Sequence, residues 1–134
     1  MKVGTDGVLL GAWARVEPQD ECFLDIGTGT GLIALMLAQR SVARITAVEI
    51  DPGSASQARE NADASPWGER IEVVCSSVQA FDPGCRFGLI VSNPPFYVDS
   101  LTCPDRGRSR ARHAETLPFA ELRDAVLRLS LIHI

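Results

Sequence analysis

The sequence contains very little lysine and no long hydrophobic run. Lys2 is the only lysine among 13 basic residues, and 17 acidic residues leave a formal net charge of −4. This balance excludes the whole-domain positive charge that drives non-specific nucleic-acid binding. No apolar run approaches the roughly 20 residues of a membrane-spanning helix, and the first residues lack the apolar stretch and cleavage site of a signal peptide. We therefore expect a protein that is neither secreted nor inserted in a membrane.

Paired cysteines are also absent. The four cysteines form no C-x-x-C motif, and the two histidines are far apart in the sequence. This spacing disfavours a zinc site and a disulfide framework, so we expect no bound metal. Cys22 and Cys75 lie in apolar, strand-like runs, which predicts buried free thiols and indicates a reducing cytoplasm.

Apolar strand-like runs alternate with helical patterns along the 134 residues, which fit one domain. Predicted strands cover residues 22–26, 44–50, 71–75 and 87–91, and predicted helices cover residues 8–13, 32–40, 52–64 and 117–129. Asp6 is a candidate N-cap of the first helix. The alternation predicts an α/β fold with a parallel sheet. Parallel sheets of this kind bind ligands beyond the carboxyl ends of their strands.

A glycine-rich loop connects the first predicted strand to the next helix. Asp25 precedes Gly27, Gly29 and Gly31, and glycines allow both a tight turn and close approach of a ligand to the backbone. The helix that follows presents free N–H groups to an anionic group. The dinucleotide fingerprint G-x-G-x-x-G would require glycine where this sequence has Leu32. The G-x-G-x-G spacing resembles instead the cofactor loop of class I S-adenosylmethionine-dependent methyltransferases.

The end of the second predicted strand carries an acidic residue suited to a ribose. Glu49 is placed to accept hydrogen bonds from both ribose hydroxyls of a cofactor, because an ionised carboxylate only accepts. Ile50 would pack against the adenine face. A nicotinamide cofactor, or a glycine turn that binds no ligand, remains an alternative interpretation of these residues.

The fourth predicted strand ends in the tetrapeptide Asn93-Pro94-Pro95-Phe96. Two prolines remove two backbone donors and stiffen the chain, which leaves the Asn93 side-chain oxygen and the Pro94 carbonyl as fixed acceptors for a planar NH₂ group. Phe96 offers a flat face for stacking. The tetrapeptide therefore predicts methyl transfer to an amino nitrogen. Hydrogen bonds from the two N–H groups would favour a pyramidal, more nucleophilic nitrogen and disperse the developing positive charge.

The sequence is similar to the bacterial tRNA1(Val) adenine-N6 methyltransferases as far as about residue 125. The matching stretches are residues 1–13, 24–31, 35–40, 47–49, 65–67, 70–71 and 92–96. The resemblance implies a Rossmann-like class I fold with helices on both faces of the sheet, S-adenosylmethionine as cofactor, and the adenosine beside the anticodon of a valine tRNA as acceptor. It also implies that Thr5 and Asp6 line the methionine end of the cofactor. Ser77 stands where many relatives have an aspartate that contacts the adenine amino group.

Two other acceptors and an inactive form fit the same motifs. Phe96 replaces the family's commoner tyrosine and also occurs in rRNA guanine-N2 methyltransferases, so guanine N2, or a glutamine side-chain amide in a release factor, is an alternative acceptor. Class I sheets are seven-stranded, whereas four strands are found in this sequence. We therefore expect residues 1–134 to form a single, incomplete methyltransferase domain, which in isolation could bind the cofactor without catalysing transfer.

A cluster of arginines follows the proline-rich tetrapeptide. Arg106, Arg108, Arg110 and Arg112 alternate within seven residues. They could hold tRNA phosphates near the site, whereas the alternative is a solvated loop whose charges serve solubility.

Overall fold

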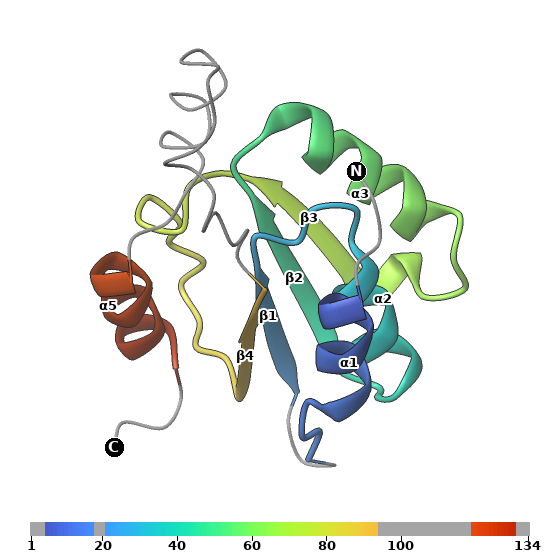
Figure 1. Cartoon of the computed structure of the whole chain (residues 1–134), viewed down its shortest axis with the longest axis horizontal. Helices are drawn as coiled ribbons and strands as arrows, with labels where there is room; N and C mark the ends of the chain where they lie inside the picture. The colour runs from blue at the N-terminus through green and yellow to red at the C-terminus, as the bar shows by residue number, and fades with distance from the viewer. Residues whose placement is uncertain (1–4, 18–20, 94–118, 131–134) are drawn as a thin grey trace.

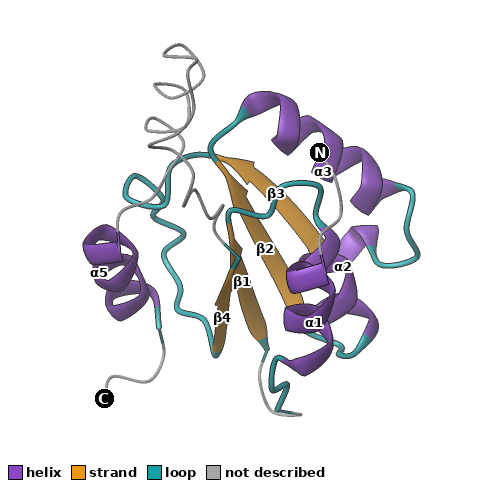
Figure 2. Cartoon of the chain, in the orientation of Figure 1, coloured by secondary structure: helices purple, strands orange, loops and turns teal. Residues whose placement is uncertain are grey.

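The computed structural model describes residues 5–17, 21–93 and 119–130, and these form a parallel sheet with helices packed on it (Figure 1). The strands are β1 (Cys22–Ile26), β2 (Arg44–Glu49), β3 (Ile71–Cys75) and β4 (Leu89–Ser92), in the order β3-β2-β1-β4. The helices are α1 (Thr5–Trp13), α2 (Leu32–Gln39), α3 (Pro52–Asp63) and α5 (Phe119–Leu129), with a short 3-10 helix η1 (Gly68–Arg70) before β3 (Figure 2). The predicted α/β fold with a parallel sheet is confirmed.

The starts of α1 and β4 differ from the sequence-based prediction by two or three residues, whereas β2, α2 and α3 each end one residue earlier than predicted. α1 begins at Thr5, so Asp6 lies in the first helical turn and is not the N-cap; an acidic residue there still interacts favourably with the helix dipole. β4 begins at Leu89 rather than at Phe87. The reason is that Phe87 forms a parallel bridge with Ser130 after α5, and its N–H donates to the Leu129 carbonyl at 2.7 Å.

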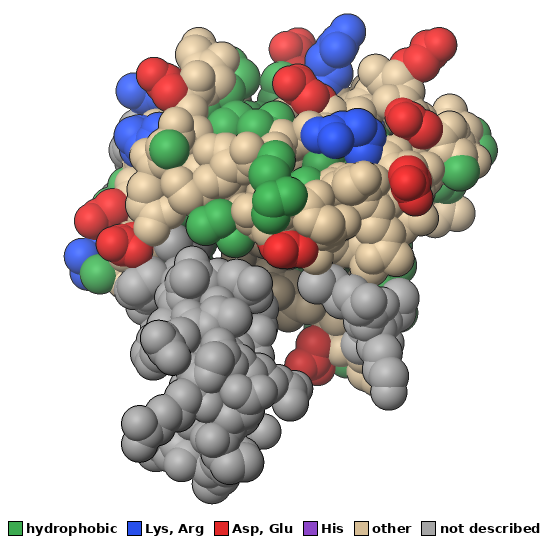
Figure 3. Space-filling view, turned by 90° about the horizontal axis from the view of Figure 1, so that it is seen from above, with side chains coloured by type: hydrophobic (Ala, Val, Ile, Leu, Met, Phe, Trp, Pro, Cys, Tyr) green, Lys and Arg blue, Asp and Glu red, His purple; other side chains and the backbone are tan. Residues whose placement is uncertain are grey.

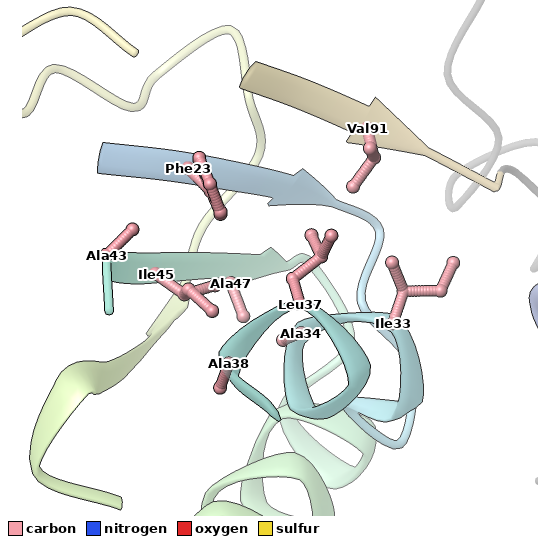
Figure 4. Close-up of a cluster of buried hydrophobic side chains, with 9 residues drawn as sticks. All are labelled: Phe23, Ile33, Ala34, Leu37, Ala38, Ala43, Ile45, Ala47 and Val91. Carbon is pink, nitrogen blue, oxygen red and sulfur yellow. The ribbon is translucent and has the colours of Figure 1, made fainter. Parts of the chain in front are cut away.

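Apolar side chains of β1 alternate between two cores, as the two-residue period of a strand requires. Phe23 packs with Ile33 and Leu37 of α2 on one face of the sheet (Figure 4). Leu24 belongs to the cluster on the other face, which includes Leu129 of α5. The expected helices on both faces are therefore present.

Arginine side chains join the ends of these elements by donating to pairs of backbone carbonyls. Arg40 donates to Gly11 and Ala14, Arg70 to Ala38 and Ala43, and Arg128 to Val78 and Phe81, at distances of 2.7–2.9 Å. The planar guanidinium presents several N–H donors in a fixed fork, which allows one side chain to satisfy two acceptors. Each of these arginines thus fixes the end of one element relative to a neighbour.

The expectation of two buried thiols is wrong for Cys75, which is exposed, and Cys22 is half-buried. β3 is the outer strand on its side of the described sheet, so its last residue is covered on one side only. No helix in the described part of the chain is long and apolar enough to cross a membrane.

Phe23 is 0% exposed at the centre of the α2-side core. We expect Phe23→Ala to lower the free energy of unfolding by about 3–5 kcal/mol, because the cavity left behind cannot close fully. Val42 is 86% exposed, and Val42→Ala should change the free energy of unfolding by no more than about 0.5 kcal/mol. Chemical denaturation of both variants measures the difference, and equal losses would contradict the assignment of this core.

Candidate functional site

The glycine-rich loop lies at the edge where the parallel strands end, toward the top of Figure 1. Gly27, Gly29 and Gly31 have φ angles of 70°, 57° and 88°, a region that side chains with a Cβ rarely adopt. The N–H groups of Gly27 and Thr28 both donate to the Val48 carbonyl, at 2.8 and 3.1 Å. A Cβ placed on Gly27 would meet no atom within 4 Å, so open space lies beside the backbone there.

Glu49 connects this loop to the next one. Its Oε1 accepts from the Gly29 N–H at 2.8 Å, and its Oε2 accepts from the Asp51 N–H at 3.0 Å. The side chain is buried apart from 8% of its surface. Each carboxylate oxygen has a second lone pair, so Glu49 can hold both loops and still accept from a ligand's hydroxyl groups.

Asp25 is a buried acid that contacts the glycine loop through Thr28. It is 0% exposed, and its Oδ2 accepts from the Thr28 hydroxyl at 2.7 Å. Burial raises the pKa of Asp25 to about 7, although the Thr28 hydroxyl and the Ala34 amide act in the opposite direction. Its other oxygen, Oδ1, is buried and has no hydrogen-bond partner among the described residues. In this conformation Asp25 contacts the loop itself rather than the open space above it.

Asn93 follows β4 on the other side of β1. The Ser92 hydroxyl donates to the Ile26 carbonyl at 3.2 Å, which ties the end of β4 to the start of the glycine loop. Asn93 is exposed, and a Cβ on Gly7 of α1 would lie 3.4 Å from its Nδ2. The structure therefore brings together the glycine loop, Asn93 and the first turn of α1.

The remaining predicted cofactor residues lie around these groups. Thr5 and Asp6 are exposed in the first turn of α1, the turn that also contains Gly7. Ile50 is 40% exposed directly after Glu49. Ser77 is half-buried after β3, and its hydroxyl oxygen accepts from the Ala80 N–H at 3.2 Å. These positions are compatible with the expected roles, which remain predictions.

Several predicted functional residues lie outside the described residues. These are Pro94, Pro95 and Phe96 of the tetrapeptide and the arginines Arg106, Arg108, Arg110 and Arg112. Seen from above the strand ends, acidic and basic side chains are interspersed over the described surface, with apolar side chains near its middle (Figure 3). In residues 5–17, 21–93 and 119–130, no three His, Cys, Asp or Glu side chains are grouped closely enough to hold a metal ion.

The described residues fit S-adenosylmethionine. A buried carboxylate at the end of β2 suits two ribose hydroxyls, and the space beside Gly27 admits a ligand against bare backbone. The exposed Asp6 offers a carboxylate partner for the ammonium of an amino-acid group. Taken together, sheet order and loop define a Rossmann-like class I methyltransferase fold.

Comparison with known proteins identifies the family. The family model described as "Methyltransferase small domain" matches residues 8–114, so the chain belongs to this family. It is 58% identical over 124 residues to a tRNA1(Val) (adenine(37)-N6)-methyltransferase of Bacteroides thetaiotaomicron, covering 91% of this chain and 52% of the relative. A protein of the same name from Edwardsiella ictaluri is 48% identical, covering 91% of this chain and 50% of the relative. The chain thus spans about half the length of these curated relatives.

Solved structures agree on the fold. Protein arginine methyltransferase 10 of Arabidopsis thaliana is 26% identical, with a TM-score of 0.60 over 69% of this chain and 26% of that protein. The glycopeptide N-methyltransferase MtfA, in complex with S-adenosyl-L-methionine, is 16% identical, with a TM-score of 0.57 over 94% of this chain and 45% of that protein. The predicted class I methyltransferase fold is confirmed.

Sequence reasoning missed the residues that support the site from neighbouring elements. Gly7 and Gly11 are the buried residues of α1, and their spacing of four places both on one helix face. That spacing could have indicated close helix packing. Neither the contacts of Arg40 nor the hydrogen bond of Ser92 has a local signal, because their partners are 29 and 66 residues away.

The raised pKa of Asp25 makes stability depend on pH. The folded protein binds this proton more tightly than the unfolded chain, whose carboxyl has a pKa near 3.8. The resulting stabilisation is complete below that value and is lost as the pH rises through about 7, at up to about 1.4 kcal/mol per pH unit. Denaturation from about pH 4 to pH 8 should show this loss in the wild type relative to Asp25→Asn. A difference between the two proteins that is constant with pH would contradict the assignment.

The two hydrogen bonds of Glu49 predict that the site needs two acceptor oxygens at this position. Glu49→Gln places an NH₂ donor against one of the two N–H groups and removes an acceptor for the ribose. Affinity for S-adenosylhomocysteine should fall about tenfold or more, as measured by calorimetry. Glu72 is an exposed acid on β3, and Glu72→Gln is the matched control with unchanged affinity. Equal affinity of Glu49→Gln and Glu72→Gln for S-adenosylhomocysteine would show that Glu49 does not contact the ligand.

Proposed function

We propose that the protein binds S-adenosylmethionine and directs its methyl group to the N6 amino group of an adenosine in tRNA, the anticodon-loop adenosine of a valine tRNA. The observation that carries the proposal is the 58% identity to a tRNA1(Val) (adenine(37)-N6)-methyltransferase over 91% of this chain. The geometry of Asn93 beside the glycine loop supports it. A tRNA substrate also places the protein in the cytoplasm.

Residues at the ends of β1 and β2 would hold the cofactor. When bound, S-adenosylmethionine supplies a methyl group on a positively charged sulfur, which an amino nitrogen can attack. Glu49 would accept from the ribose hydroxyls while it keeps the Gly29 and Asp51 amides in place. Ile50, 40% exposed beside it, would cover the adenine. Ser77 would provide a hydroxyl near the adenine amino group, and Asp25 would maintain the loop through Thr28.

Asn93 would orient the acceptor amine. Its Oδ1 accepts one N–H of the amino group, which turns the nitrogen lone pair toward the site and offsets positive charge that develops on the nitrogen. The Ser92–Ile26 hydrogen bond fixes the strand end that carries Asn93, so orientation is determined before the substrate binds. The proposal assigns Pro94, Pro95 and Phe96 to the same acceptor pocket. An adenosine must be unstacked to reach it, at a cost of a few kcal/mol.

A transfer assay distinguishes the possible acceptors. The full-length protein is incubated with labelled S-adenosylmethionine and, separately, with total tRNA, total rRNA or a release factor. We expect label only in tRNA, recovered as N6-methyladenosine after nucleoside digestion. Label recovered as N2-methylguanosine or N5-methylglutamine would replace the proposed acceptor with that one. Cofactor binding without any label would favour a binding protein that lacks activity.

Asn93→Ala separates orientation of the acceptor from cofactor binding. The change should reduce the rate of methyl transfer by about a hundredfold or more, as for other removed hydrogen-bond groups that act at the transition state. Affinity for S-adenosylhomocysteine should stay within about twofold, because Glu49 and the loop are untouched. Gln57 is exposed on α3, and Gln57→Ala is the control with full activity. A parallel loss of cofactor affinity in Asn93→Ala would argue against the assigned role.

The arginine cluster is proposed to contact tRNA phosphates. Changing Arg106, Arg108, Arg110 and Arg112 together to alanine should weaken tRNA binding and flatten its dependence on salt, because fewer counterions are released. Binding is measured across a salt series by filter retention. An unchanged slope would identify the cluster as a solvated loop without a role in binding.

A further inference from the structure

The first turn of α1 lies beside the residue proposed to orient the acceptor. Gly7 is buried, and a Cβ at this position would be 3.4 Å from Asn93 Nδ2 and 3.5 Å from Leu32 Cδ2. Leu32 is the first residue of α2, directly after the glycine loop. The position of α1 therefore decides how closely its first turn approaches both the loop and Asn93.

Arg40 holds α1 in that position from the end of α2. Its Nη1 donates to the Gly11 carbonyl and its Nη2 to the Ala14 carbonyl, each at 2.7 Å. The last turn of α1 has no basic residue of its own, so Arg40 supplies the cation that the negative end of the helix dipole favours. Close contact supports the same placement, since a Cβ on Gly11 would lie 3.0 Å from Met36 Cβ, an atom that cannot move without the helix.

The order of the strands sets the direction of a bound cofactor. β2 and β4 flank β1 on opposite sides, so Glu49 and Asn93 lie on either side of the glycine loop. A cofactor with its ribose at Glu49 that crosses the loop toward the acceptor reaches Asn93 and the first turn of α1. The end that reaches this turn is the part beyond the ribose, which includes the charged amino-acid group.

We propose that Arg40 is a positioning residue that determines affinity for the amino-acid end of S-adenosylmethionine, acting through the placement of α1. The inference rests on the proposed function. Loss of the two Arg40 hydrogen bonds lets α1 leave its docked position for part of the time. Apparent affinity falls in proportion to the fraction of protein that is competent to bind, but only for ligands that need the first turn of α1.

Arg70, the last residue of η1, provides a matched control that donates to the same end of α2. It makes an equivalent pair of hydrogen bonds, to Ala43 at 2.7 Å and to Ala38 at 2.8 Å, and contacts no residue of α1 through them. Removing either guanidinium removes two hydrogen bonds from a charged donor to backbone carbonyls. A general effect on folding should therefore affect both variants, whereas displacement of α1 should affect only the Arg40 variant.

The test compares two ligands by calorimetry with the full-length protein. S-adenosylhomocysteine contains the amino-acid group, and 5′-methylthioadenosine keeps the adenosine and sulfur without it. We expect Arg40→Met to weaken binding of S-adenosylhomocysteine about fivefold while binding of 5′-methylthioadenosine changes less than about twofold. Arg70→Met should leave the ratio of the two affinities as in the wild type. Arg40→Lys, which keeps the charge but not the fork, should restore part of the loss.

Gly11→Val gives an independent route to the same state if Arg40→Met folds poorly. Its side chain meets Met36 and should displace α1 by contact, with the same selective loss. An unchanged ratio of affinities in both variants would overturn the role of Arg40. Failure of the wild type to bind either ligand would instead refute the proposed function, and the two outcomes are therefore distinguishable.

Discussion

The site depends on one buried carboxylate that joins two loops. Parallel strands end in backbone amides that the sheet does not pair, and Glu49 satisfies two of them, one in the loop after β1 and one after β2. Its own carbonyl accepts from the Ser76 N–H at 3.0 Å and extends the connection to the segment after β3. Three consecutive strand ends are thereby held in one arrangement. A ligand that binds Glu49 meets loops that are already in place, which limits the conformational entropy lost on binding.

Asp25 and Glu49 are both buried acids, and they differ in their hydrogen-bond partners. One oxygen of Asp25 accepts from Thr28, the other has no partner among the described residues, and burial raises the pKa of the carboxyl. Glu49 has a backbone donor on each oxygen. Each of these oxygens has a further lone pair, so Glu49 suits a role that requires an acceptor. The glycine loop thus contacts two acids. Asp25 accepts from the Thr28 hydroxyl, and Glu49 accepts from the backbone N–H groups of Gly29 and Asp51.

Much of the fold could be predicted because its signals are local. Pro52 in the first turn of α3, after the N-cap Asp51, and the apolar run of β1 each specify an element without reference to the rest of the chain. The proximity of Gly29 and Glu49 could also be predicted, because both lie at the ends of strands that pair with each other. The start of β4 could not be predicted from its own residues, because Phe87 forms a bridge with Ser130, the residue that follows α5. The docking of α1 depends on Arg40 and Met36 in a different helix, for which the α1 sequence carries only the small residues Gly7 and Gly11.

The strand order explains how residues proposed for the cofactor and for the acceptor come from different parts of the sequence and yet lie beside the same loop. β1 is central, with β2 and β4 on its two sides, so residues 49 and 93 are separated along the chain but flank the same loop. A hydrogen bond from Ser92 to Ile26 fixes the side proposed for the acceptor, and one from Gly29 to Glu49 fixes the side proposed for the cofactor. Both connect to β1 and its loop, and neither depends on the other. Under the proposed function, a change after β4 in the residues assigned to the acceptor therefore leaves the Gly29–Glu49 contact unaltered.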